Sequence, residues 1–118
     1  MDRPLNPVDI ETTIRSVSDD IYRGVWEVTK AETAAREAER AYDRAFAHAY
    51  LDADGPAYAK KYVAELGTEP ERDALDVAQL AFRHAERLSR ALDAKLRAYQ
   101  SIGASVRTIY GASTGFGG

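Results

Sequence analysis

The chain has 118 residues, of which 45% are hydrophobic and 30% charged, with no cysteine and a formal net charge of −3 at pH 7. This length allows one domain at most, the apolar content excludes a disordered chain, and the lack of cysteine excludes disulfides and thiolate metal sites. The negative charge argues against nucleic-acid binding driven by overall charge. With no apolar run near ~20 residues and no signal-peptide pattern, we expect a cytoplasmic protein.

The first predicted element is a long helix over residues 7–51. Asn6 followed by Pro7 is typical of a helix N-cap with proline at the first helical position. From there, apolar and small residues recur at alternating steps of four and three, which indicates a heptad seam. The seam positions are Ile10, Ile14, Val17, Ile21, Gly24, Val28, Ala31, Ala35, Ala38, Tyr42, Ala45 and Ala49.

A turn and a short helix follow. Asp52, Gly55 and Pro56 form a breaker cluster, after which the sequence predicts a short helix over 56–66 that ends at Gly67. This short helix carries Tyr58, Tyr62 and Leu66 on one face. The run Thr-Glu-Pro-Glu over 68–71 has the pattern of a capping box for the next helix.

A second long helix is predicted over 69–110, with Gly111 ending it and residues 112–118 forming a glycine-rich tail too irregular for a helix. Its predicted seam is Ala74, Ala78, Ala81, Ala85, Leu88, Leu92, Leu96, Tyr99, Ile102, Val106 and Ile109 or Tyr110.

These elements predict an all-α fold, a long antiparallel, coiled-coil-like helical hairpin over residues 1–111 with a short helix at its turn. If residues 51 and 69 face each other, Gly24 lies opposite Leu96 and Val17 opposite Gly103, so that large side chains meet small ones. Residues 1–35 carry four bases against seven acids, and residues 83–118 carry six bases against two acids. A charge match between the helices explains this asymmetry better than a partner-binding patch does.

The apolar face of the first helix is wider than one partner helix covers, because Tyr22, Val25 and Trp26 lie beside the seam. We therefore predict a homo-oligomer. The alternative is that the tail folds back and Phe116 covers Trp26. The candidate oligomer interface is Ile14, Ile21, Tyr22, Val25, Trp26, Tyr99, Val106 and Tyr110.

No pattern in the sequence predicts an enzyme, a cofactor or a metal site. With Gly55 at the sixth position of a calcium loop, Tyr50 falls at the first position and Lys61 at the twelfth, which rejects calcium binding. His48 and His84 are the only histidines, and the predicted register keeps them apart. We therefore expect a non-enzymatic protein.

Basic residues recur along the middle of both long helices and in the short one. Arginines with interleaved rings such as Tyr42 and Phe46 are typical of a groove for single-stranded nucleic acid. The alternative is a solvated face, since Glu32 and Glu39 are close enough to pair with these arginines. The candidate nucleic-acid or partner surface is Arg36, Arg40, Arg44, Lys60, Lys61, Arg83, Arg87 and Arg90.

The segments AAREAERAY (34–42) and LRAYQSIGASVR (96–107) resemble small alanine-rich helical-hairpin proteins of actinobacterial tailed phages. In shape, such proteins are similar to the recombination mediators of T4-like phages, helical hairpins that form rings on single-stranded DNA. The resemblance covers most of the chain and carries over no functional residue. It implies an accessory factor in DNA recombination or replication that binds single-stranded DNA or a recombinase in the host cytoplasm. The alternative is a protein–protein module, either an inhibitor of a host factor or a virion component.

Overall fold

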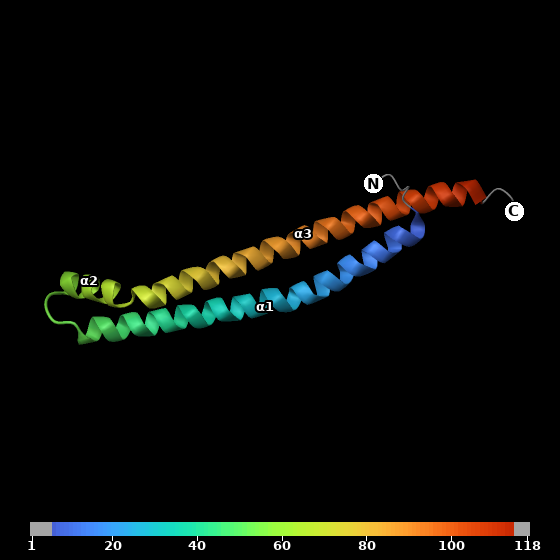
Figure 1. The fold of residues 1–118 in the computed structure, drawn as a ribbon. Coiled ribbons are helices and arrows are strands. Elements are labelled where there is room, and N and C mark those ends of the chain that lie inside the picture. Colours follow the sequence, from blue (N-terminus) through green and yellow to red (C-terminus); the bar gives the residue numbers. More distant parts are fainter. Residues whose placement is uncertain (1–5, 115–118) are drawn as a thin grey trace. The chain divides into compact units, whose positions relative to one another are not determined.

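The computed structural model describes residues 6–114, with side chains over 6–111, and this part of the chain holds three helices and no strand (Figure 1). Helix α1 spans Pro7–Asp52, α2 spans Ala57–Gly67 and α3 spans Glu69–Thr114. The predicted all-α hairpin is confirmed, since α1 and α3 form a long pair in contact with each other. Predicted helix ends agree with the observed ones to within one residue, except at the end of α3.

The chain divides into two compact units. The terminal unit comprises residues 1–26 and 87–118, and the turn unit comprises residues 27–86. In each unit a segment of α1 pairs with a segment of α3. The division follows neither helix boundary, because both long helices run from one unit into the other.

Helix α1 begins as the sequence predicts. The backbone N–H of Asp9 donates to Oδ1 of Asn6 at 2.9 Å, and Nδ2 of Asn6 donates to Oδ2 of Asp9 at 2.7 Å. The Asn6 side chain thus satisfies an amide that the first helical turn leaves without a partner. The predicted N-cap is confirmed.

The predicted seam of α1 is also confirmed. All twelve positions are buried or half-buried, and Ile10, Val17 and Ala35 are the most buried apolar residues of α1. The turn unit adds Ala64, which is fully buried in α2. Across the described residues the apolar core is small, because these four are the hydrophobic residues that are buried.

The predicted seam of α3 is partly wrong. Positions 78, 85, 92, 96, 99 and 106 are half-buried as expected. Leu75, Phe82, Ser89 and Gly103 take the places of Ala74, Ala81, Leu88 and Ile102, and Ile109 and Tyr110 are both exposed. Ser89 is less exposed than Leu88, and Gly103 is buried whereas Ile102 is exposed. At Gly103 the helices come too close for a larger residue, whereas nearer the turn the larger Leu75 and Phe82 face α1 in place of Ala74 and Ala81. The observed seam is Glu71, Leu75, Ala78, Phe82, Ala85, Ser89, Leu92, Leu96, Tyr99, Gly103 and Val106.

The predicted register is wrong by about one helical turn. A Cβ atom on Gly24 would meet Leu92 at 3.9 Å rather than Leu96, and one on Gly103 would meet Ile10 at 3.1 Å and Ile14 at 3.6 Å, rather than Val17. The pairing of large with small residues nevertheless holds, because both glycines face leucine or isoleucine.

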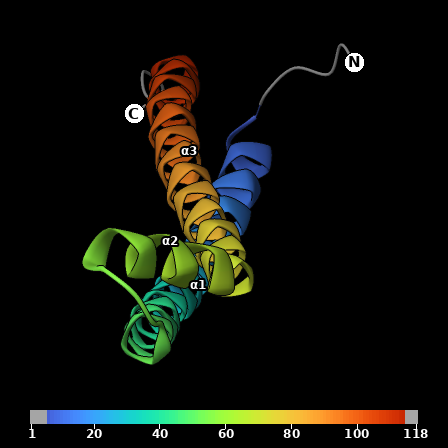
Figure 2. The same ribbon diagram turned by 90° about the vertical axis from the view of Figure 1, so that its left-hand side faces the viewer.

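The error in register comes from the turn. In the turn unit α2 runs across the direction of α1 (Figure 2), and a Cβ atom on Gly67 would lie 4.0 Å from that of Ala49. The chain is therefore already level with Ala49 before α3 begins at Glu69, so residues 51 and 69 do not set the register. Gly55 makes the turn with a φ of 101°, a left-handed conformation that favours glycine.

The predicted capping box at 68–71 is wrong. Thr68 is buried, and its hydroxyl donates to the carbonyl oxygen of Ala64 at 2.7 Å instead of accepting from an amide of α3. Thr68 thereby closes the end of α2, while its own carbonyl accepts from the backbone N–H of Arg72 at 3.0 Å. A single residue thus joins the last turn of α2 to the first turn of α3.

The predicted end of the second long helix is also wrong. Helix α3 continues through Gly111 to Thr114, because one glycine costs a helix only about 1 kcal/mol relative to alanine. Phe116 and the other residues of 115–118 lie outside the described part of the chain, as does the proposed contact of Phe116 with Trp26.

Candidate interaction surfaces

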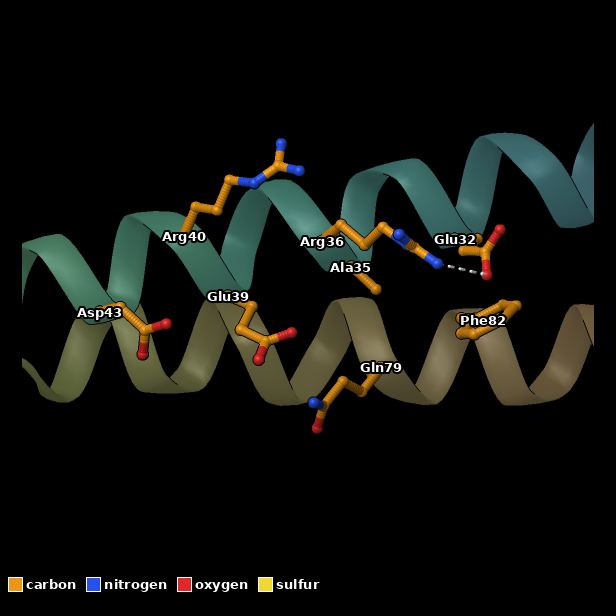
Figure 3. A pocket seen from close by; sticks show the side chains of 8 residues that line it. All are labelled: Glu32, Ala35, Arg36, Glu39, Arg40, Asp43, Gln79 and Phe82. Atoms are coloured by element: carbon orange, nitrogen blue, oxygen red, sulfur yellow. Dashed lines mark hydrogen bonds and ion pairs between the residues drawn. The ribbon is translucent and has the colours of Figure 1, made fainter.

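The turn unit contains a groove of about 500 Å³ between α1 and α3 (Figure 3). Six of its lining residues come from α1 and two from α3. In Figure 3, Arg36 extends toward Glu32, while Arg40 points away from α3. The lining residues are Glu32, Ala35, Arg36, Glu39, Arg40, Asp43, Gln79 and Phe82.

Acids outnumber bases in this groove. Nη2 of Arg36 lies 3.4 Å from Oε2 of Glu32, an i,i+4 ion pair on an exposed face. Glu39 and Asp43 share the groove with Arg40, so three carboxylates oppose two guanidinium groups. A phosphate entering here would meet a net negative charge. The local electrostatics therefore disfavour a polyanion.

The structure brings few of the predicted basic residues together. Arg36 and Arg40 line the groove, whereas Arg44 and Arg83 belong to the same unit without lining it, and Arg87 and Arg90 belong to the terminal unit. Lys60 Nζ lies 5.8 Å from the centroid of the Tyr50 ring, and Lys61 Nζ lies 4.0 Å from Oε1 of Glu65. These two lysines thus have local partners. All eight residues are exposed except Lys60, which is half-buried.

The candidate oligomer interface lies entirely in the terminal unit and separates into two groups. Ile14, Ile21, Tyr99 and Val106 are half-buried along the seam between α1 and α3. The others are exposed, namely Tyr22, Val25, Trp26 and Tyr110. That either group contacts another copy stays a prediction.

A second, shallower groove of about 320 Å³ lies in the terminal unit. Its lining on α1 contains charges of both signs, and α3 contributes one arginine. The lining residues are Glu11, Ile14, Arg15, Ser18, Asp19 and Arg107.

The outer face of α2 is a further apolar surface. Tyr58, Tyr62 and Leu66 follow one another at steps of four, so they lie on one face of α2, and all three are exposed. The buried side of α2 is instead formed by Ala64. Aromatic side chains usually mark the buried face of a helix, so their exposure on α2 is unusual.

Glu71 was expected in the first turn of α3 as the last residue of the capping box. It does lie in that turn, but it begins the observed seam and its Oε2 atom is buried with no hydrogen-bond partner. His48 and His84 are both exposed. Among the described residues no group of three or more acids, histidines or cysteines is placed to hold a metal ion.

No known protein family, curated protein or solved structure matches the chain. No helix in the described part is long and apolar enough to cross a membrane.

Proposed function

We propose that the protein is a non-enzymatic helical-hairpin module that works by binding other proteins. The observation that supports this most is that many of its large apolar side chains are exposed and few are buried. Among the described residues, four hydrophobic residues are buried, whereas fifteen large ones are exposed. Contiguous exposed apolar surface is unusual on a monomer and is typical of a protein-binding site.

Two apolar surfaces are available for partners, and each is defined within one unit. The α1 face consists of Tyr22 and Trp26 in the terminal unit, and the α2 face consists of Tyr58, Tyr62 and Leu66 in the turn unit. Aromatic residues are enriched in the energetic centres of interfaces. An inhibitor of a host factor and a virion assembly component both belong to this class of function.

The test is quantitative binding with matched variants. The tagged chain is incubated with extract of the cells in which it acts, and each retained protein is then purified and titrated. We expect saturable binding that falls at least tenfold with Tyr62→Ala or Trp26→Ala but not with Arg97→Ala, which removes an exposed side chain of α3. Binding that is unaffected by every aromatic substitution on both faces contradicts the proposal.

A second candidate is an accessory factor in DNA recombination or replication that binds single-stranded DNA. One observation favours it, namely that Arg36 and Arg40 line a groove that also contains the ring of Phe82. It ranks second because of the carboxylates in the same groove. Anisotropy of a labelled oligonucleotide at low salt tests it. This candidate requires binding that weakens with salt, falls with Arg40→Glu and rises with Glu39→Gln.

A further inference from the structure

One face of α1 in the terminal unit carries charges in such an order that, beside an antiparallel copy of the same helix, acids and bases lie at the same level. Six exposed residues follow one another at steps of three, four, four, four and three, and they wind slowly across one side of the helix. The step pattern reads the same in both directions. In chain order they are Val8, Glu11, Arg15, Asp19, Arg23 and Trp26.

We propose that a second copy of the chain covers this face, with the two α1 helices antiparallel around a two-fold axis at the level of residue 17. This inference rests on the proposed function, because Trp26 belongs both to the α1 face and to these six residues, and the inference names the partner of that face. A two-fold axis there places Arg15 level with Asp19 of the other copy. It also places Glu11 level with the other copy's Arg23, and Val8 level with its Trp26.

Charge complementarity selects this pairing. In the antiparallel arrangement each acid on the face is level with a base of the other copy and each base with an acid, with Arg15 and Asp19 nearest the axis, while the exposed apolar residues at the two ends are level with each other. A parallel, in-register pair would place every charge opposite an identical one. An antiparallel pair shifted by one turn would place Arg15 level with the other copy's Arg23. Like charges across an interface are costly and suppress such alternatives.

The apolar ends provide the area to be buried. Val8 is 71% exposed and Trp26 is 63% exposed, and Tyr22, one turn before Trp26, is 69% exposed. Because the pairing is two-fold, each contact occurs twice, and both copies bury these three side chains. Aromatic burial at both ends with charges between them gives an interface both affinity and a fixed register.

The shallow groove borders this face on the side toward α3. Glu11, Arg15 and Asp19 line it together with Arg107 of α3. Arg23 pairs with Asp20 of its own helix, but both are solvent-exposed, so exchange of that partner costs little.

Trp26 is the only tryptophan of the chain, so its fluorescence reports on this face alone. We expect its emission to shift to shorter wavelength as concentration rises, in parallel with a doubling of the molar mass by light scattering. Within one copy, Val8 and Trp26 lie about 27 Å apart along the helix, at 1.5 Å per residue. Val8→Ser should therefore abolish the shift only if the two residues meet between copies.

Charge reversal tests the pairing independently of tryptophan. Arg15→Glu or Asp19→Lys alone should raise the dimer dissociation constant at least tenfold, and the two substitutions in one chain should restore it. Arg97→Glu, at an exposed arginine of α3 in the same unit, is the control and should leave the constant unchanged. Circular dichroism of each variant checks that the helices are retained.

Two results overturn the proposal, and both leave the proposed function separately testable. The first is a chain that remains a monomer up to ~0.5 mM with unchanged tryptophan emission. The second is a dimer whose dissociation constant stays raised in the double charge swap. If the monomer still binds another protein through Trp26, the α1 face is an interaction site whose partner is not a second copy.

Discussion

The three glycines of the long helices in the terminal unit provide a test of how closely α1 and α3 approach. Gly24, Gly103 and Gly111 all lie within helices, so alanine at each position improves helix propensity by about 0.8–1 kcal/mol in a helix interior. They differ in what an added Cβ atom would meet. Because all three belong to one unit, their effects are directly comparable.

At Gly24 the new methyl group would lie 3.9 Å from Cδ1 of Leu92, an ordinary van der Waals contact. The gain in propensity is then joined by partial burial of one methyl group, for which full burial is worth about 0.8 kcal/mol. We expect Gly24→Ala to stabilise the protein by about 1–1.5 kcal/mol.

At Gly103 the new methyl group would lie 3.1 Å from Cγ2 of Ile10, which is only 2% exposed. Isoleucine has one strongly preferred χ1 rotamer in a helix, so this contact is relieved only by movement of the helices. Overpacking of this kind costs about 1–3 kcal/mol, which exceeds the gain in propensity. We expect Gly103→Ala to destabilise the protein by about 1 kcal/mol.

Gly111→Ala is the reference, since no atom lies within 4 Å of its added Cβ. It reports propensity alone, reduced by its place near the end of α3, and we expect a stabilisation of about 0.5 kcal/mol. Thermal unfolding followed by circular dichroism measures all three, at roughly 4 °C per kcal/mol for a chain of this size. The protein concentration must be fixed, because self-association raises Tm with concentration. If Gly103→Ala stabilises as much as Gly24→Ala does, the close approach at Ile10 is refuted.

Three further substitutions test the turn unit. Thr68→Val removes the hydroxyl that donates to the carbonyl oxygen of Ala64, and it should lower the free energy of unfolding in urea by about 1–2 kcal/mol. Thr68→Ser keeps the hydrogen bond and should cost clearly less. Equal losses for the two variants contradict this role of the hydroxyl. Gly55→Ala forces a side chain into a positive φ and should cost about 1–2 kcal/mol, while Ala53→Gly beside it should not reproduce that loss. Ala35→Leu at the buried seam should cost about 1–3 kcal/mol, and Ala34→Leu on the exposed side should change stability by less than about 0.5 kcal/mol; similar values would place the seam elsewhere.

The helices of this fold follow from the sequence because they are signalled locally. The Asn6 cap, the breaker cluster at Asp52–Pro56 and the heptad seam of α1 each depend on residues close together in the chain. Thr68 shows where local signals fail. Its hydroxyl could act on the helix before it or the helix after it, and only the packing of α2 against α1 decides between them.

The prediction of the α3 seam was partly wrong for a different reason. Apolarity favoured Leu88 over Ser89 and Ile102 over Gly103, but the narrow gap between the helices admits only the smaller residue of each pair. Size, rather than apolarity, decides these two positions, whereas Leu75 and Phe82 replace Ala74 and Ala81 in the half of the seam nearer the turn. The sequence therefore predicted which residues are apolar but not which of them are exposed, and the exposed ones form the candidate sites.

The same selection by size links the stability of the protein to its association. Small residues such as Gly103 and Ala35 occupy part of the contact between α1 and α3, while Trp26, Tyr22 and other large side chains are exposed. The hairpin thus leaves much of its apolar surface in water, where a second surface could cover it. A partner that covers the α1 face binds the folded helix and not the unfolded chain, so it must stabilise the hairpin by mass action. Substitutions that tighten the seam, such as Gly24→Ala, should in turn strengthen association wherever the isolated hairpin is partly unfolded, because they raise the fraction of chains competent to bind.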